Sequence, residues 1–249
     1  MALLALFGTH NLSAADGEGA RSEIRVAVAS NFLPTLKKLV AIYQAEGRSH
    51  VKIIAASTGK LYAQIIHGAP FDLFLSADSR RPLLLTQSGH AVASSRFTYA
   101  LGKIALWSAQ KKITNCRAAL VDGQFKRLAI ANPKTAPYGL AAQQALKQMA
   151  LWDKLKPRLV RGENITQALH YTDSGNAQLG IVALSQALSL GKRGGCLWEI
   201  PTDLYEPIVQ QAVLLSHRSK RHRAAENFME FLHSARAKEL IRSAGYGVL

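Results

Sequence analysis

The sequence predicts an α/β protein with two lobes, each built on a mixed, mostly parallel sheet with flanking helices. β-Rich segments alternate with segments of helical periodicity from Glu23 onward, which is typical of sheets covered by helices. Two β-rich runs, 97–107 and 205–215, are longer than most strands. We expect these runs to be crossover strands that carry the chain between the lobes.

The length and composition fit this organisation. The chain has 249 residues, of which 48% are hydrophobic and 19% charged, enough for two lobes of about 100–120 residues each. We expect lobe one to comprise residues 23–103 and 207–249, and lobe two to comprise residues 104–206. Beyond the N-terminus no apolar run reaches about 18 residues, so we expect no membrane-spanning helix.

Residues 1–22 are expected to be a signal peptide followed by a flexible segment. Leu3–Phe7 is a short apolar run, and Ser13-Ala14-Ala15 has the small residues of a signal-peptidase site. The stretch lacks the basic residues of a complete signal. A flexible N-terminus of a cytosolic protein is the alternative, and we favour export.

In lobe one the first strand is expected at Ile24–Ala29, where β-branched residues alternate with small ones. The next segment, Phe32–Glu46, has apolar residues at helical spacing, with Pro34 tolerated in the first turn. The other elements expected in this lobe are strands at 51–55 and 72–76 and helices at 60–67, 79–88, 224–233 and 235–244.

In lobe two the segment QLGIVA, at 178–183, is apolar almost throughout, as in a buried strand. The segment 132–139 contains two prolines and is expected to be a loop. The other elements expected in this lobe are strands at 127–131, 159–160 and 196–200 and helices at 140–149, 152–155 and 165–171.

Four loops, at 29–31, 57–59, 137–139 and 164–165, each follow a predicted strand and precede a predicted helix. Ligands of such sheets bind at this position, where free backbone N–H groups and the positive ends of helix dipoles meet. The loops supply hydroxyl, phenol, amide and backbone donors, with Lys60 as the one charge nearby. Neutral donors suit a fully ionised tetrahedral anion, because each buried oxygen must be hydrogen-bonded. For any one of these residues, a plain helix cap is the alternative.

Catalytic and metal sites find little support. Thr58-Gly59-Lys60 resembles the end of a phosphate-binding loop, but Leu61 replaces the required Ser or Thr and the upstream Gly is missing. The eight histidines are scattered, without metal-ligand spacing. We therefore expect no cofactor, no direct protein ligands to a metal cation and no enzymatic activity.

The net charge is +15, from 31 Lys and Arg against 16 Asp and Glu. Such a charge is compatible with nucleic acid, an anionic membrane or an anionic ligand. The densest basic cluster, 217–223, is not interleaved with aromatic residues for base stacking. A solvated loop is therefore favoured over a nucleic-acid surface.

Two cysteines, Cys116 and Cys196, are 80 residues apart and match no metal or redox motif. One disulfide and two separate thiols are both open.

With these residues in place, the chain resembles the periplasmic molybdate-binding proteins of ABC transporters. The resemblance runs from about Ile24 to the C-terminus, and its segments are VAVASNF, AASTGKLYAQIIHGAPFDLFLSAD, SRFTYALGKIALWSA, IANPKTAPYGLAA, LGIVALSQ and YEPIVQQAV. It implies the two-lobed type II periplasmic binding protein fold. It also implies a periplasmic monomer that binds molybdate, and also tungstate, for an inner-membrane ABC permease and its ATPase, without binding nucleic acid.

The resemblance implies four ligand-binding residues in lobe one. Ser30 corresponds to the hydroxyl residue that follows the first strand, and Asn31 lies beside it. Thr58 corresponds to the second hydroxyl residue, and Ser57 is adjacent.

For lobe two, the resemblance implies that the oxyanion is held by the backbone N–H of Ile165. Many family members have a ligand Tyr at the end of the LGIV strand, where this chain has Ala183. Tyr138 matches the Tyr that another branch of the family uses.

Three alternatives remain at this stage. The first is a binding protein for sulfate or phosphate, and the second is a ligand-sensing domain of the same fold. The sensing domain would need a DNA-binding helix pair ahead of the first strand. The third is an enzyme on the same lobes, for which the sequence offers no nucleophile–base set.

Overall fold

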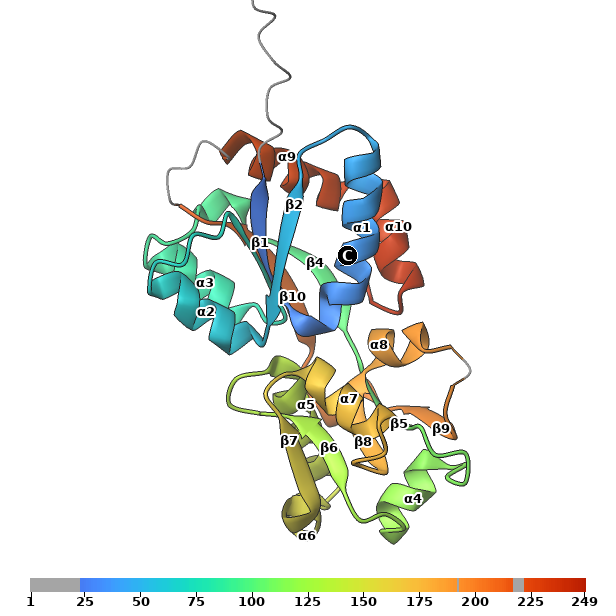
Figure 1. The fold of residues 1–249 in the computed structure, drawn as a ribbon. Coiled ribbons are helices and arrows are strands. Elements are labelled where there is room, and N and C mark those ends of the chain that lie inside the picture. The colour runs from blue at the N-terminus through green and yellow to red at the C-terminus, as the bar shows by residue number, and fades with distance from the viewer. Residues whose placement is uncertain (1–22, 192, 217–221) are drawn as a thin grey trace, which may run out of the picture.

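The computed structural model describes residues 23–191, 193–216 and 222–249 and contains two five-stranded sheets (Figure 1). We name each sheet with its helices a lobe. The order in lobe one is β2-β1-β3-β10-β4, and in lobe two it is β7-β6-β8-β5-β9. The predicted signal, residues 1–22, and positions 217–221 of the basic cluster lie outside the described residues. The exact lobe boundaries remain a prediction.

The strands of lobe one are β1 (Ile24–Ala29), β2 (Val51–Ala56), β3 (Leu73–Ser76), β4 (Phe97–Gly102) and β10 (Ile208–Leu214). Its helices are α1 (Leu33–Ala45), α2 (Thr58–Ile66), α3 (Arg80–Gln87), α9 (His222–His233) and α10 (Ala235–Ser243). Alternating residues of β1 face opposite sides of the sheet, as the strand period requires. Val26 and Val28 pack with α1, α9 and α10, whereas Ala27 packs with α2 and α3.

The strands of lobe two are β5 (Ile104–Ser108), β6 (Leu128–Ala131), β7 (Leu159–Gly162), β8 (Leu179–Ala183) and β9 (Cys196–Glu199). Its helices are α4 (Cys116–Asp122), α5 (Pro137–Gln148), α6 (Trp152–Leu155), α7 (Ile165–Asp173) and α8 (Leu184–Ser189). Two of these helices, α4 and α8, were not predicted. Both are short, and α8 begins directly after β8 without an intervening turn.

Both sheets are mixed, as predicted. In lobe one, β1 pairs in parallel with β2 and β3, whereas β10 is antiparallel to β3 and β4. In lobe two, β6 pairs in parallel with β7 and β8, whereas β5 is antiparallel to β8 and β9. The parallel pairs are thus half, not most, of these strand pairs, because β10 and β5, next to the crossovers, run against their neighbours.

The two long β-rich runs connect the lobes, but neither is one continuous strand. Lys103 separates β4 from β5, which belong to different sheets. In the second run only β10 is a strand, and Pro207, which has no N–H to pair, lies just before it. No helix in the described ranges has both the length and the apolar character to cross a bilayer.

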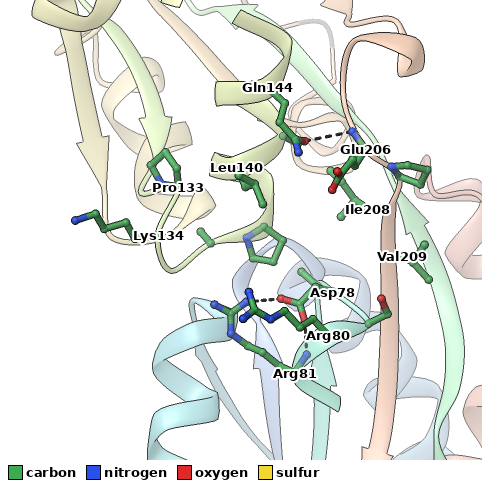
Figure 2. A pocket seen from close by; sticks show the side chains of 16 residues that line it. Asp78, Arg80, Arg81, Pro133, Lys134, Leu140, Gln144, Glu206, Ile208 and Val209 are labelled. Atoms are coloured by element: carbon green, nitrogen blue, oxygen red, sulfur yellow. Dashed lines mark hydrogen bonds and ion pairs between the residues drawn. The ribbon is translucent and has the colours of Figure 1, made fainter. Parts of the chain in front are cut away.

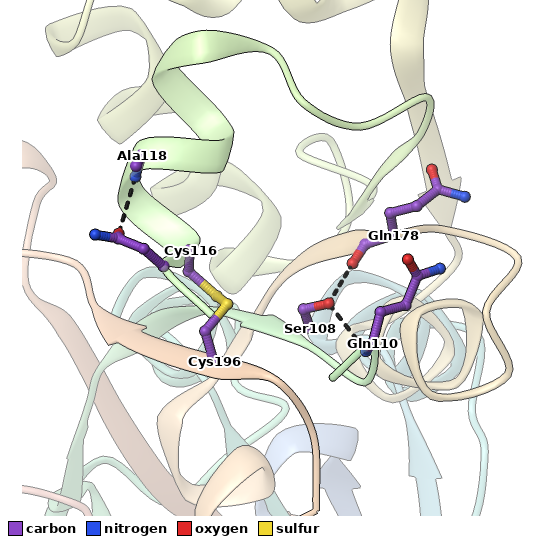
Figure 3. The surroundings of a disulfide bond; sticks show 7 residues. Ser108, Gln110, Cys116, Ala118, Gln178 and Cys196 are labelled. Carbon is purple, nitrogen blue, oxygen red and sulfur yellow. Dashed lines mark hydrogen bonds between the residues drawn. A yellow bond between two sulfur atoms is a disulfide. The ribbon is translucent and has the colours of Figure 1, made fainter. Parts of the chain in front are cut away.

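A disulfide between Cys116 and Cys196 joins α4 to β9 at the edge of lobe two (Figure 3). The two Cα atoms are 5.5 Å apart, a normal separation for a disulfide. The sequence left open a disulfide or two separate thiols, and the structure contains the disulfide.

Replacing both cysteines by serine should lower the free energy of unfolding by about 2–4 kcal/mol. The cross-link spans 80 residues, and closing such a loop restricts the unfolded chain. Urea denaturation of the double variant, beside the wild-type protein with and without reductant, measures the effect. An unchanged midpoint in both comparisons would contradict the stabilising role.

Candidate functional site

A small cavity between the lobes is lined by all six residues predicted to bind a ligand. Its volume is about 10 Å³, and the non-atom space around it, which includes open solvent, is about 180 Å³. The lining comprises Ala29, Ser30, Asn31, Ser57, Thr58 and Ala77 from lobe one, and Ala136, Pro137, Tyr138 and Ile165 from lobe two. The structure therefore brings the predicted residues together, and their role as ligand contacts remains a prediction.

Strand ends and helix beginnings position these residues. The turn of 3₁₀ helix at Ser30–Phe32 follows β1, and α2 follows β2 with Ser57 as its N-cap. In lobe two, α5 follows the loop after β6 and α7 follows β7 with Asn164 as its N-cap. Three helices thus direct their N-termini, with free N–H groups and positive dipole ends, to one place.

Two of these helices begin earlier than predicted. Helix α2 begins at Thr58 rather than Lys60, and α5 begins at Pro137 rather than Leu140. Proline suits a first helical position, because its missing N–H is not needed there. As a result, Thr58 and Tyr138 lie in the first turns of their helices.

The lining of the cavity carries no charged side chain among the described residues. The nearby Lys60 points across to lobe two, where its Nζ lies 2.6 Å from Oε2 of Glu163. Both side chains of this pair are about half exposed, so its contribution to stability is small. Any ligand in the cavity is therefore held by neutral donors and helix ends.

Hydroxyl groups supply donors in lobe one. The Oγ1 of Thr58 accepts a hydrogen bond of 3.1 Å from the backbone N–H of Ala77, which leaves the hydroxyl proton free to be donated. The Oγ of Ser57 is buried and has no hydrogen-bond partner within the described structure. Because an unpaired buried hydroxyl costs about 1–3 kcal/mol, an acceptor bound in the cavity would remove this penalty.

Tyr138 supplies a phenol from lobe two. Burial, followed by the neighbouring Tyr246, Tyr99 and Tyr205, raises the pKa of Tyr138 well above its usual value, although the hydrogen bond from Asn31 lowers it. The phenol therefore keeps its proton at neutral pH and is a donor.

The side-chain amide of Asn31 bonds to other protein groups and is not free to bind a ligand. Its Nδ2 donates to Oε1 of Gln210 at 2.7 Å, and lies 3.2 Å and 3.3 Å from the hydroxyls of Tyr138 and Tyr246. The amide nitrogen thus belongs to the wall of the cavity. The donor that Asn31 can still offer a ligand is its backbone N–H, which lies in the first turn of a helix.

Sequence reasoning missed part of the lining and most of the wall. Ala77 follows β3 at its carboxyl end, so the rule that selected the other loops would have found it. Tyr246 gave no local signal. The one indication for Gln210 was that it is a polar residue inside a predicted strand, where the structure buries it completely.

Hydrogen bonds close the two lobes over the cavity. The N–H of Gly59 donates to the carbonyl of Thr135 at 2.9 Å. The carbonyl of Ser30 accepts from Oγ1 of Thr166 at 3.1 Å and from Nε2 of Gln186 at 3.3 Å. These bonds describe a closed conformation.

A larger groove lies beside the cavity and shares Ala77, Ala136 and Pro137 with it. Figure 2 shows Arg80 and Lys134 on its two sides, and a pair formed by Arg81 with Asp78. None of the six predicted residues lines this groove. The small cavity is therefore the better candidate, because the unpaired hydroxyl and the helix ends meet there.

Residues 24–247 match the family model described as bacterial extracellular solute-binding protein. The chain belongs to this family. It is similar to the molybdate-binding protein ModA of Azotobacter vinelandii, with 44% identity over 229 residues, 91% of this chain and 90% of that protein. It is also similar to ModA of Rhodobacter capsulatus, with 41% identity over 227 residues, 91% and 89% of the two chains.

The solved structure of the Azotobacter vinelandii periplasmic molybdate-binding protein matches this solute-binding protein with a TM-score of 0.86 and 40% identity. The match covers 91% of this chain and 99% of that one. The type II periplasmic binding protein fold predicted from the sequence is thereby confirmed.

Proposed function

We propose that this solute-binding protein holds molybdate, and also tungstate, in the cavity between its lobes and delivers it to an ABC permease and its ATPase in the inner membrane. The observation that carries the proposal is a small cavity between the lobes, lined by neutral donors at the N-termini of three helices. The similarity to proteins named as molybdate-binding supports it. The protein then acts as an exported periplasmic monomer, without cofactor or catalysis.

The donors around the cavity are sufficient in number. The hydroxyls of Ser30, Ser57, Thr58 and Tyr138 and the N–H groups of Asn31 and Ile165 all belong to lining residues. A hydrogen bond to a charged oxygen contributes about 1.5–3 kcal/mol, so six give a gross ~10–20 kcal/mol. Association takes back several kcal/mol, which leaves micromolar affinity or better.

The same donors select against protonated anions. Backbone and amide donors already occupy the oxygens of Thr58 and Tyr138, and no carboxylate lines the cavity in the described chain. An anion that carries its own O–H, as phosphate does at neutral pH, would therefore have to donate to a neutral Ser hydroxyl, such as that of Ser57, which has no partner in the described structure, instead of to a carboxylate. Sulfate carries no such proton, so its discrimination rests on cavity size.

Isothermal titration calorimetry tests the function on the exported protein. Molybdate and tungstate should bind with micromolar or lower Kd, and phosphate should bind more weakly, because the described lining offers its proton no carboxylate acceptor. Sulfate should also be weaker. Heat from sulfate or phosphate, and none from molybdate or tungstate, would replace this proposal by a sulfate- or phosphate-binding protein.

Removing single donors should weaken molybdate binding. Ser30→Ala, Thr58→Val and Tyr138→Phe should each raise Kd by a factor corresponding to about 1–3 kcal/mol, because one buried anion oxygen loses its partner. Ser88→Ala, on the exposed end of α3, is the matched control. If all three variants bind like the control, the anion does not occupy this cavity.

Closure is the second part of the proposal. We take residues 23–103 with 207–249, and 104–206, as the bodies that close on the ligand. A Cβ at Gly59 would lie 2.9 Å from the carbonyl oxygen of Thr135 on the opposite lobe. Gly59 lies in the first turn of α2, without a left-handed backbone, so the helix itself accepts a side chain.

The change Gly59→Ala should therefore weaken ligand binding without lowering the stability of the protein. The thermal midpoint of the ligand-free protein should stay the same or rise, since alanine favours helix by up to about 1 kcal/mol. Molybdate should bind at least ~10-fold more weakly with faster release, because the methyl group obstructs closure. Calorimetry and stopped-flow measurements give both values. Unchanged release would mean that closure at this contact does not retain the anion.

A further inference from the structure

The geometry points to Gln210 as a positioning residue that aims the Tyr138 hydroxyl at the bound oxyanion. The inference rests on the proposed function and concerns a residue outside the cavity lining. Gln210 lies in β10, just after the chain returns from lobe two, and its side chain is completely buried. Its amide is therefore held in one place in the sheet of lobe one.

One amide contacts the polar wall from both lobes. The Oε1 of Gln210 accepts from Nδ2 of Asn31 at 2.7 Å, in lobe one. The Nε2 of Gln210 donates to the hydroxyl oxygen of Tyr138 at 3.4 Å, in lobe two. The second bond therefore joins the two lobes.

Asn31 determines which way the amide faces, because its Nδ2 is a donor and lies 2.7 Å from Oε1 of Gln210. The single proton of the Tyr99 hydroxyl is donated either to the carbonyl of Ser76, at 3.1 Å, or to Oε1 of Gln210, at 3.3 Å. If the amide were reversed, its NH₂ would face the donor nitrogen of Asn31, and its oxygen would take the proton of Tyr138. The orientation with Oε1 toward Asn31 satisfies all of these groups.

This orientation sends the phenol proton into the cavity. The oxygen of Tyr138 accepts from the amides of Asn31 and Gln210. Within the described structure its own proton has no protein acceptor. Because Tyr138 lines the cavity, an anion oxygen is the acceptor that completes the arrangement.

The chain also makes room for the phenol beside this wall. A Cβ at Gly102 would lie 2.3 Å from the hydroxyl oxygen of Tyr138. Any other residue at the end of β4 would displace the phenol from Gln210. The absence of a side chain at this crossover therefore belongs to the same arrangement.

A double-mutant cycle tests the inference with molybdate calorimetry. Gln210→Met keeps the length of the side chain and removes both polar groups, and should raise Kd about 10- to 100-fold. In a Tyr138→Phe background the same change should raise Kd less than about three-fold, since Gln210 acts through the phenol. A glutamine needed only for stability would weaken binding equally in both backgrounds.

The neighbouring Gln211→Met is the matched control. It lies on the same strand, is half-buried, and bonds instead with Arg96 and Thr98. Its Kd should stay within about two-fold of wild type, whatever the change in thermal midpoint.

A second variant, Gln210→Glu, covers the case in which the methionine variant does not fold. The carboxylate still accepts from Asn31, but its second oxygen faces Tyr138 and takes the phenol proton away from the anion. Binding should be weak at about pH 8 and recover toward pH 5.5, as the Glu becomes protonated. The wild-type Kd should stay constant over that range.

The inference would be overturned if Gln210→Met raised the molybdate Kd equally in the wild-type and Tyr138→Phe backgrounds, or if the Kd of Gln210→Glu did not change with pH. Either result would leave the proposed function intact. Absence of molybdate binding by the wild-type protein would overturn both.

Discussion

The uncharged cavity between the two lobes is the feature on which the arrangement of the strands, helices and crossovers depends. With no cation among the described residues of its lining, it can hold an anion only through hydrogen bonds and helix ends, and these must surround the ligand. A single lobe supplies donors from one side. The carboxyl ends of β1 and β2 must therefore face those of β6 and β7, and the crossovers after β4 and before β10 produce this arrangement.

Close approach of backbone segments is the second requirement, and glycines meet it. A Cβ at Gly139 would lie 2.4 Å from the carbonyl oxygen of Ala131, so only glycine lets α5 begin tightly against the end of β6. Gly59 and Gly102 play corresponding parts at the contact between the lobes and beside the phenol. These positions bring donors within hydrogen-bond distance rather than providing flexible turns, since none of the three has a left-handed backbone.

Stability and binding are located in different parts of the molecule. The disulfide lies at the outer edge of lobe two, away from the cavity lining. The cavity itself contains an unpaired buried hydroxyl on Ser57, which destabilises the empty closed form. The fold tolerates this because large apolar clusters cover both faces of the sheet in lobe one and the sheet in lobe two. Closure therefore becomes more favourable when an acceptor fills the cavity.

The sequence by itself determined the alternation of strands and helices, because the periodicity of β1 and α1 is local. It also placed Ser30, Thr58, Tyr138 and Ile165 at strand ends, where a ligand belongs. The tertiary structure decided what surrounds them. Asn31 and Gln210 are 179 residues apart in the chain, and only folding shows that their amides share one wall. The tertiary structure also showed that the two cysteines form a disulfide and that α5 begins at Pro137. A local pattern contains no information about partners so distant, since their contact depends on how the two sheets pack.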